Sequence, residues 1–133
     1  RYDIENYEVE YVDKEELSAR LKHIKYGFVL RQNCTVNNVA TPTKFSNYLS
    51  NGIIPIYSSA LKSFAEYDKN NAVGIICDID RLDEGVSAIE QSMNKSLDSL
   101  EVKDKCKRIF SDYYNAAGYK SSICNKLKEM NLC

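Results

Sequence analysis

Short apolar runs alternate along this chain with longer stretches that carry apolar residues at helical spacing. Three runs, over residues 26–31, 53–57 and 72–77, are almost continuously apolar. Such runs are typical of parallel strands that are covered on both faces. A further segment, residues 7–12, alternates apolar with acidic side chains. That alternation predicts a half-exposed strand near the edge of a sheet.

Helices are predicted between and after these strands. Asp13 and Glu16 form a capping-box pattern in front of a helix that runs to about Ile24. Thr41 and Pro42 fit the N-cap and the first position of a second, short helix. The remaining apolar helix faces are Leu61, Phe64 and Ala65; Leu82, Val86, Ile89 and Met93; Val102, Cys106, Ile109, Phe110 and Tyr113; and Ile123, Leu127 and Met130.

This alternation predicts an α/β fold with a Rossmann-like parallel sheet of about four strands. Helices are expected on both faces, with the C-terminal helices packed on the domain. The 133 residues are enough for one domain, so residues 1–133 are expected to form a single unit. The sequence starts at Arg1 and contains no G-x-G-x-x-G loop. We therefore expect a fragment of a larger two-domain protein, whose first strand and Gly-rich loop precede Arg1.

The first turn of the predicted second helix carries a lysine where the helix macrodipole disfavours a cation. Lys44 at this position costs about 0.3 to 1 kcal/mol if it is exposed and has no ligand. A bound anion would make this position of Lys44 favourable, because the free amides, the Thr43 hydroxyl and the Lys44 ammonium can converge on one phosphate. Asn47, one turn further on, can bond whatever continues from that phosphate. A surface lysine without a ligand is the alternative.

Arg31 ends a predicted strand and opens a long polar loop, over residues 31–41. Two to six residues are usual for a strand-to-helix connection, and ligands collect at the carboxyl ends of parallel strands. The planar guanidinium of Arg31 can hold a phosphate with two bonds, or it can pair with a nearby carboxylate.

Two aspartates and two serines follow other predicted strands. Asp78 and Asp80 suit acid–base or metal chemistry, but Asp80 is also well placed to cap the next helix, which we favour. Ser58 or Ser59 is expected to cap the helix after residues 53–57.

A family resemblance rests on residues 25–58. In order, the residues that carry it are Gly27, Phe28, Val29, Leu30, Arg31, Val36, Asn37, Pro42, Thr43, Lys44, Phe45, Tyr48, Leu49, Gly52, Ile53, Ile54, Pro55 and Ile56. This pattern resembles the donor-binding, C-terminal domain of GT-B-fold glycosyltransferases, in particular bacterial enzymes of capsule and lipopolysaccharide biosynthesis. The resemblance implies transfer of a sugar from a nucleotide diphosphate-sugar to a surface-polysaccharide acceptor, with no metal and no cofactor.

The same resemblance implies a role for individual residues. Thr43 and Lys44 would hold the phosphates and Arg31 would assist. Two glutamates of the family fall on Val39 and Asn47; the asparagine can bond a ribose hydroxyl but brings no charge, which predicts a weaker contact. The acceptor and any general base would come from an N-terminal domain of the same polypeptide. The chain alone is therefore expected to bind a nucleotide weakly and to transfer nothing.

Composition limits the partners and the cellular compartment that suit this chain. A net charge of −1 gives no electrostatic footprint for nucleic acid. The five cysteines form no C-x-x-C pair, which favours reduced thiols in a cytoplasmic protein over zinc or disulfides. The C-terminal third is locally basic; a solvated helix face is favoured, and contact with anionic lipid in the full-length protein stays open.

His23 is the only histidine, and no nucleophile is placed beside it, so we predict no Ser-His-Asp or Cys-His site. Two alternatives to sugar transfer stay open. One is a non-catalytic α/β interaction domain whose donor site has decayed. The other is a nucleotide-sugar epimerase, which shares the GT-B architecture.

Overall fold

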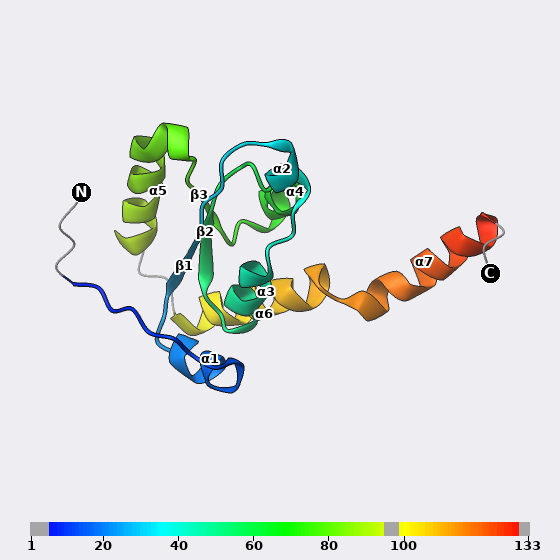
Figure 1. Cartoon of the computed structure of the whole chain (residues 1–133), viewed down its shortest axis with the longest axis horizontal. Helices are drawn as coiled ribbons and strands as arrows, with labels where there is room; N and C mark the ends of the chain where they lie inside the picture. Colours follow the sequence, from blue (N-terminus) through cyan, green and yellow to red (C-terminus); the bar gives the residue numbers. More distant parts are fainter. Residues whose placement is uncertain (1–5, 95–98, 131–133) are drawn as a thin grey trace.

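The computed structural model describes residues 6–94 and 99–130 of the chain (Figure 1). Its elements are, in order, α1 (Lys14–Leu21), β1 (Tyr26–Val29), α2 (Thr35–Val39), α3 (Thr43–Ser50), β2 (Ile54–Tyr57), α4 (Lys62–Asn71), β3 (Ile75–Ile76), the 3-10 turn η1 (Ile79–Arg81), α5 (Leu82–Asn94), α6 (Ser99–Tyr113) and α7 (Ala116–Glu129). None of these described helices is long and apolar enough to cross a membrane.

The strands form a parallel sheet in the order β1-β2-β3. Tyr26 pairs with Ile54 at the start of β1, and Ile56 pairs with Ile75 at the start of β3. In Figure 1, α5 lies on one side of the sheet and α3, α4 and α6 lie on the other. The predicted α/β architecture with helices on both faces is confirmed.

The sheet of the described chain has three strands where about four were expected. Residues 7–12 form no strand, and Tyr7, Val9 and Tyr11 are 73%, 84% and 94% exposed. The prediction of a strand here is wrong for this structure, because alternation shows only that a segment suits a sheet edge; a strand also needs a pairing partner. The helix that follows does start where predicted, with Asp13 as N-cap, but no side-chain cap bond forms.

Pro55 lies in the central strand, which is unusual because proline cannot donate to a ladder. The Ile54 amide donates to the Lys25 carbonyl in front of β1, so the backbone groups of Pro55 point the other way, toward β3. Pairing with β3 begins only at Ile56. The missing N–H of Pro55 therefore costs no ladder bond.

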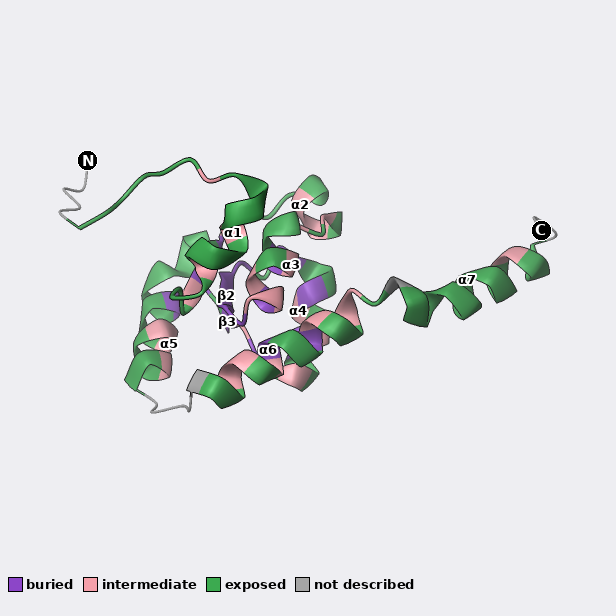
Figure 2. Ribbon diagram, turned by 90° about the horizontal axis from the view of Figure 1, so that it is seen from below, coloured by how far each residue is buried: buried purple, intermediate pink, exposed green. Residues whose placement is uncertain are grey.

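The core is an aromatic cluster on the face of the sheet that carries α3 and α4. Phe45 of α3, Tyr57 of β2 and Phe64 of α4 have ring centroids 4.4 to 5.5 Å apart. Cys106 and Ile109 of α6 close the same cluster. Figure 2 shows the buried residues gathered between the sheet and these helices, whereas α1 and α7 are mostly exposed.

The C-terminal end of the described chain departs from the expected packing. Helix α6 packs on the domain as predicted, against α3, but α7 projects away from the body (Figure 1). Tyr119, Ile123 and Met130, which belong to its apolar face, are all more than half exposed. The expectation that both C-terminal helices pack on the domain therefore holds for α6 alone.

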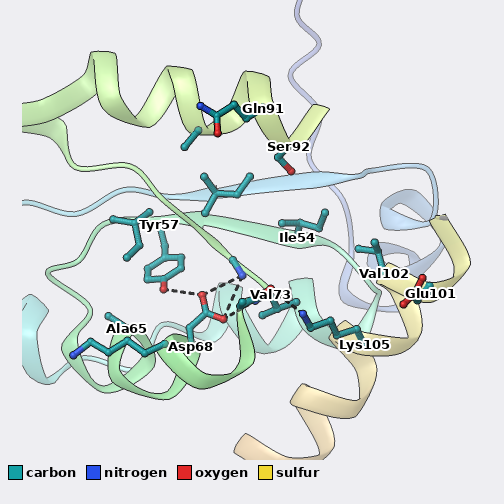
Figure 3. A pocket seen from close by; sticks show the side chains of 16 residues that line it. Ile54, Tyr57, Ala65, Asp68, Val73, Gln91, Ser92, Glu101, Val102 and Lys105 are labelled. Atoms are coloured by element: carbon teal, nitrogen blue, oxygen red, sulfur yellow. Dashed lines mark hydrogen bonds between the residues drawn. The ribbon is translucent and has the colours of Figure 1, made fainter. Parts of the chain in front are cut away.

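A buried carboxylate ties α4 to β2 and to the turn that leads into β3 (Figure 3). Asp68, only 6% exposed, accepts hydrogen bonds from the Tyr57 hydroxyl at 2.9 Å and from the backbone amides of Val73 at 2.8 Å and Gly74 at 3.1 Å. Burial, together with the nearby Asp68, raises the pKa of Tyr57. The phenol therefore stays protonated and keeps donating to Asp68.

We expect Asp68→Asn to lower the free energy of unfolding by about 1 to 3 kcal/mol, because the amide nitrogen would face groups that now donate to a carboxylate. Urea unfolding at neutral pH measures the loss. Asp104→Asn, at an exposed site of α6, is the matched control and should change stability by less than about 0.5 kcal/mol. Equal effects of the two substitutions would contradict a structural role for Asp68.

Candidate functional site

The three strands end at one edge of the sheet, and the segments that follow them surround a hollow of about 470 Å³. Its lining residues are Arg31, Gln32 and Asn33 after β1, Ser59 and Ala60 after β2, and Asp78, Ile79, Asp80 and Arg81 after β3. The carboxyl edge of a parallel sheet is where open α/β folds bind ligands. This hollow is therefore the first candidate for a functional site.

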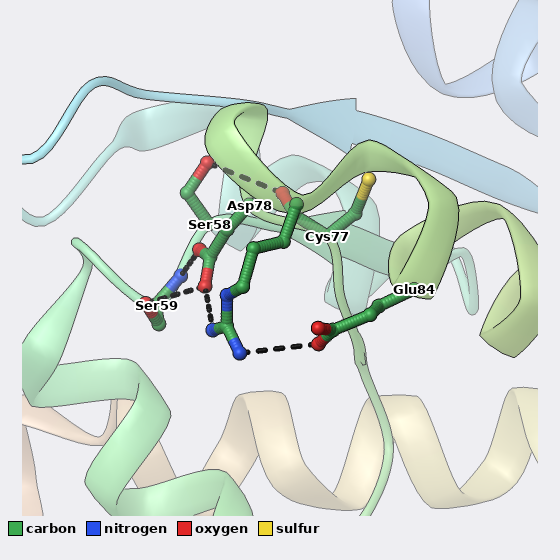
Figure 4. Close-up of polar contacts among 6 residues, drawn as sticks. Ser58, Ser59, Cys77, Asp78 and Glu84 are labelled. Atoms are coloured by element: carbon green, nitrogen blue, oxygen red, sulfur yellow. Dashed lines mark hydrogen bonds and ion pairs between the residues drawn. The ribbon is translucent and has the colours of Figure 1, made fainter.

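A charged network joins two sides of the hollow (Figure 4). The carboxylate of Asp78 accepts hydrogen bonds from the amide of Ser59 at 2.7 Å, from the hydroxyl of Ser59 at 2.9 Å and from the guanidinium of Arg81 at 2.8 Å. The second terminal nitrogen of Arg81 donates to Glu84 at 3.1 Å. Asp78 and Arg81 are thus already paired with protein groups.

The protonation states follow from these contacts. Burial alone would raise the pKa of Asp78, but the hydrogen bonds from Ser59 and Arg81 outweigh burial and lower it. The bond to Asp78 raises the pKa of Arg81. Both groups stay charged near neutral pH, so Asp78 is suited to holding the β2 and β3 ends together and poorly suited to acid–base catalysis.

The expected helix caps at this edge are wrong. Asp78, not Asp80, occupies the N-cap position of the turn η1 that leads into α5, and Asp80 lies inside that turn. Helix α4 has Leu61 at its N-cap and so starts three residues later than a Ser58 cap, or two later than a Ser59 cap, would require. The serines bond across the sheet edge instead, because the strand ends bring polar partners closer than the helix does.

Arg31 is held in place through its backbone. Its amide donates to the hydroxyl of Ser58 at 2.8 Å, and this hydroxyl donates to the Cys77 carbonyl at a long 3.5 Å. Ser58 is buried, so it ties the end of β1 to the ends of β2 and β3. The Arg31 side chain is exposed in the hollow and forms no ion pair within the described residues.

The other predicted site residues lie on α3. Thr43, Lys44 and Asn47 are all exposed, and within the described chain none of the three lines the hollow that contains Arg31. The backbone carbonyls of Thr43 and Asn47 accept bonds from Ser46 and Ser50. The structure thus presents Arg31 and the α3 residues as two separate groups.

The first turn of α3 is only partly free to bind a ligand. The helix begins at Thr43, with Pro42 at the N-cap, one residue later than expected, and no side chain caps it. The Phe45 amide already donates to the Pro42 carbonyl at 3.0 Å. The Lys44 ammonium makes no ion pair with any described residue.

The predicted polar loop contains a short helix that sequence reasoning missed. In α2, which lies within residues 31–41, Val36 and Val39 are 73% and 77% exposed. The Asn37 side chain donates to the Gln32 carbonyl at 2.8 Å and closes the loop back on the end of β1. Val39, at the position of one family glutamate, therefore lies on the surface.

A larger hollow of about 680 Å³ lies between β3, α4, α5 and α6 (Figure 3). Four charged residues line it: Asp68, Lys69, Glu101 and Lys105. Three of them have protein partners, because Asp68 accepts from Tyr57, Lys69 pairs with Glu66, and the Lys105 ammonium donates to the Ala72 carbonyl at 2.9 Å. Asp68 and Lys105 therefore serve to maintain the fold.

The cysteines of the described chain are unpaired. Cys34 and Cys124 are exposed, whereas Cys77 and Cys106 are buried; Cys133 lies outside the described residues. Burial raises the pKa of Cys77 and, to about 11, that of Cys106, so both buried thiols stay protonated. Among the described residues no group of three histidine, cysteine or acidic side chains is placed to hold a metal ion.

Comparison with known proteins found no match to this chain among protein-family models, curated proteins or solved structures. Functional inference therefore depends on the residues described above and on the sequence pattern of residues 25–58.

We expect Ser59→Ala to destabilise the protein by about 1 kcal/mol at pH 7, because Asp78 loses a hydrogen bond to its charged form. The folded pKa of Asp78 lies below its unfolded value. Its contribution is therefore fully present above the unfolded pKa, near 3.9, and is lost as the pH falls through the folded pKa.

Urea unfolding at pH 7 and at pH 3 tests this dependence, with the exposed Ser111→Ala as control. The difference between wild type and Ser59→Ala should shrink at pH 3. A difference that is the same at both pH values would show that the Asp78 bonds do not depend on its charge.

Proposed function

We propose that this chain is the donor-binding part of a GT-B-fold glycosyltransferase. In this proposal the carboxyl edge of a Rossmann-like sheet binds a nucleotide diphosphate-sugar, and the sugar is transferred to a surface-polysaccharide acceptor. The single observation that supports it most is the hollow at that edge, which contains the exposed Arg31, a cation without an ion-pair partner among the described residues. A guanidinium in such a place suits a diphosphate because it can donate two parallel hydrogen bonds.

The charge distribution also favours an anionic ligand. No aspartate or glutamate occurs from residue 17 to residue 65, a stretch that includes β1, α3 and β2. Arg31 and Lys44 lie within it, and neither forms an ion pair with the described residues. Arg31 and Lys44 would therefore attract a diphosphate with no carboxylate from this stretch to oppose them. The carboxylates of the hollow, Asp78 and Asp80, come from the segment after β3, and Asp78 is already paired with Arg81.

The proposed roles follow from position. Helix α3 leads from the carboxyl-edge loop back to the start of β2, so its first turn is the one nearest that loop. Thr43 and Lys44 in this turn would hold the phosphates, and Asn47 would reach the ribose. Arg31, which lies apart from them in the hollow, would assist from that side. Cationic side chains and helix amides would then offset the charge that builds up on the leaving diphosphate.

In the full-length protein, an N-terminal domain would supply the acceptor site and any general base. The whole enzyme would work in the cytoplasm. Its basic C-terminal region could also contact a membrane surface. The chain alone would bind donor without turnover. Product analysis on the full-length protein separates a transferase from a nucleotide-sugar epimerase.

A second candidate is a non-catalytic α/β interaction domain. It is favoured by the two positions where the family has glutamate, because exposed Val39 cannot bond a hydroxyl and Asn47 brings no charge. A decayed donor site of this kind would leave the fold intact and lose affinity for nucleotides.

Thermal unfolding in the presence of UDP, GDP, CDP or ADP tests donor binding. A nucleotide at 100 times its dissociation constant should stabilise the chain by about 2.7 kcal/mol, which raises the melting temperature measurably. We expect Arg31→Ala and Lys44→Ala to reduce this shift. If no nucleotide shifts the melting temperature at millimolar concentration, the donor-site proposal fails for this chain.

The matched controls are Arg108→Ala and Lys107→Ala, which remove the same charges from exposed sites on α6. They should leave the nucleotide-induced shift unchanged. A loss of shift in the controls as well would indicate a general charge effect and no specific phosphate site.

We expect Asn47→Glu to strengthen nucleotide binding about tenfold, because a carboxylate adds a charge-assisted bond to a ribose hydroxyl, worth about 1.4 kcal/mol. Isothermal titration calorimetry with the nucleotide that shifts the melting temperature most measures the gain. Asn70→Glu, exposed on α4, carries the same charge change and should show none. Equal affinities for the two variants would remove Asn47 from the site.

A further inference from the structure

The outer edge of β1 is open. In the described chain β1 pairs with β2 alone. The Lys25 carbonyl accepts from Ile54 of β2, so strand geometry turns the backbone groups of Tyr26 and Phe28 outward, away from β2. One side chain reaches this edge: the Tyr48 hydroxyl lies 3.4 Å from the Phe28 carbonyl, a long contact that leaves both outward amides free. An edge of this kind is ready to pair with another strand.

An apolar side chain stands uncovered on the same strand. The Tyr26 hydroxyl lies 3.4 Å from the Ser92 hydroxyl of α5, so Tyr26 points to the face of the sheet that α5 covers. Phe28, two residues further on, points to the same face and yet is 54% exposed. Helix α5 therefore leaves the end of β1 without cover.

The segment in front of α1 has the composition that such an edge requires. Residues 7–11, which we name the arm, place Tyr7, Val9 and Tyr11 on one side of an extended chain and Glu8 and Glu10 on the other. All five side chains are exposed. The apolar side of the arm is therefore uncovered in the described structure.

Charge favours the same pairing. Lys25 directly precedes β1 and Arg31 follows it, and no acidic residue lies between residues 17 and 65. The arm carries Glu8 and Glu10, with more acidic residues in the first turn of α1 behind it. The acidic arm and the basic edge of β1 are complementary in charge. Such complementarity raises the association rate and favours this pairing over others.

The geometry points to a second copy of the chain as the source of the strand. Helix α1 lies at the amino end of β1, and in Figure 1 the arm runs outward from α1, away from the sheet. Helix α1 buries none of its own residues. Among the described residues the arm makes one ion pair, between Glu10 and Arg20 at 3.5 Å, and a surface pair of this kind contributes little stability.

We propose that the arm of one copy adds as a strand to the outer edge of β1 in a second copy, and that the reciprocal exchange builds a symmetric dimer. Main-chain hydrogen bonds to Tyr26 and Phe28 provide the pairing, and the apolar side of the arm covers Phe28. Two arms of five residues make a small interface, so the dimer forms at high protein concentration and dissociates on dilution.

Sedimentation velocity of the full chain over tenfold steps in concentration, combined with hydrogen exchange at the Tyr26 and Phe28 amides, tests the proposal. Val9→Pro removes the backbone N–H of residue 9 and disfavours pairing of the arm as a strand, whereas Val9→Thr keeps a strand-forming residue. Val9 is 84% exposed, so neither change disturbs the core. We expect wild type and Val9→Thr to dimerise, with amide protection that rises with concentration, and Val9→Pro to dimerise at least tenfold more weakly.

Three results would overturn the proposal. A monomer at every concentration with unprotected amides would leave the edge open. A monomer with protected amides would mean that the arm pairs with β1 of its own chain. A dimer that Val9→Pro does not weaken would place the contact elsewhere on the surface.

Discussion

The buried carboxylate of Asp68 is the contact on which the arrangement of β2, α4 and β3 depends. A charged group in this position is tolerated because three donors surround it: the Tyr57 hydroxyl and the amides of Val73 and Gly74. They belong to the central strand and to the turn that leads into β3. By fixing that turn, Asp68 sets where β3 begins and hence where its carboxyl end meets the ends of the other strands.

The candidate site is a consequence of that alignment. With the three strand ends at one edge, the buried Ser58 joins them through its hydroxyl, and Asp78 closes onto Ser59 and Arg81. These bonds engage one of the two aspartates and one of the two arginines of the hollow. Arg31 is left as an exposed cation in a stretch without carboxylates, which is the electrostatic basis for proposing an anionic ligand.

The two ends of the described chain show the opposite situation, in which apolar residues have no cover. The arm in front of α1 and the apolar face of α7 are both exposed, and the edge of β1 is unpaired. Sheets with an open edge and uncovered apolar side chains tend to find a partner strand, whether from another copy or from a longer chain. In the compact part of the molecule, by contrast, the apolar side chains are buried around the cluster of Phe45, Tyr57 and Phe64.

From β1 onward the sequence alone determined the order of the strands and the longer helices, because continuous apolar runs and helical spacing are local signals. The short α2 and the turn η1 carry no such signal. Tertiary structure decided everything that needs a second segment. Residues 7–12 have the alternation of a strand but no partner strand. Asp78 occupies the cap position that was expected for Asp80. Ser58, expected to cap a helix, accepts a bond from the end of β1 instead. The Arg31 side chain could be named in advance because it follows an apolar run; its separation from Lys44 could not, since that depends on how the loop and α2 fold between them.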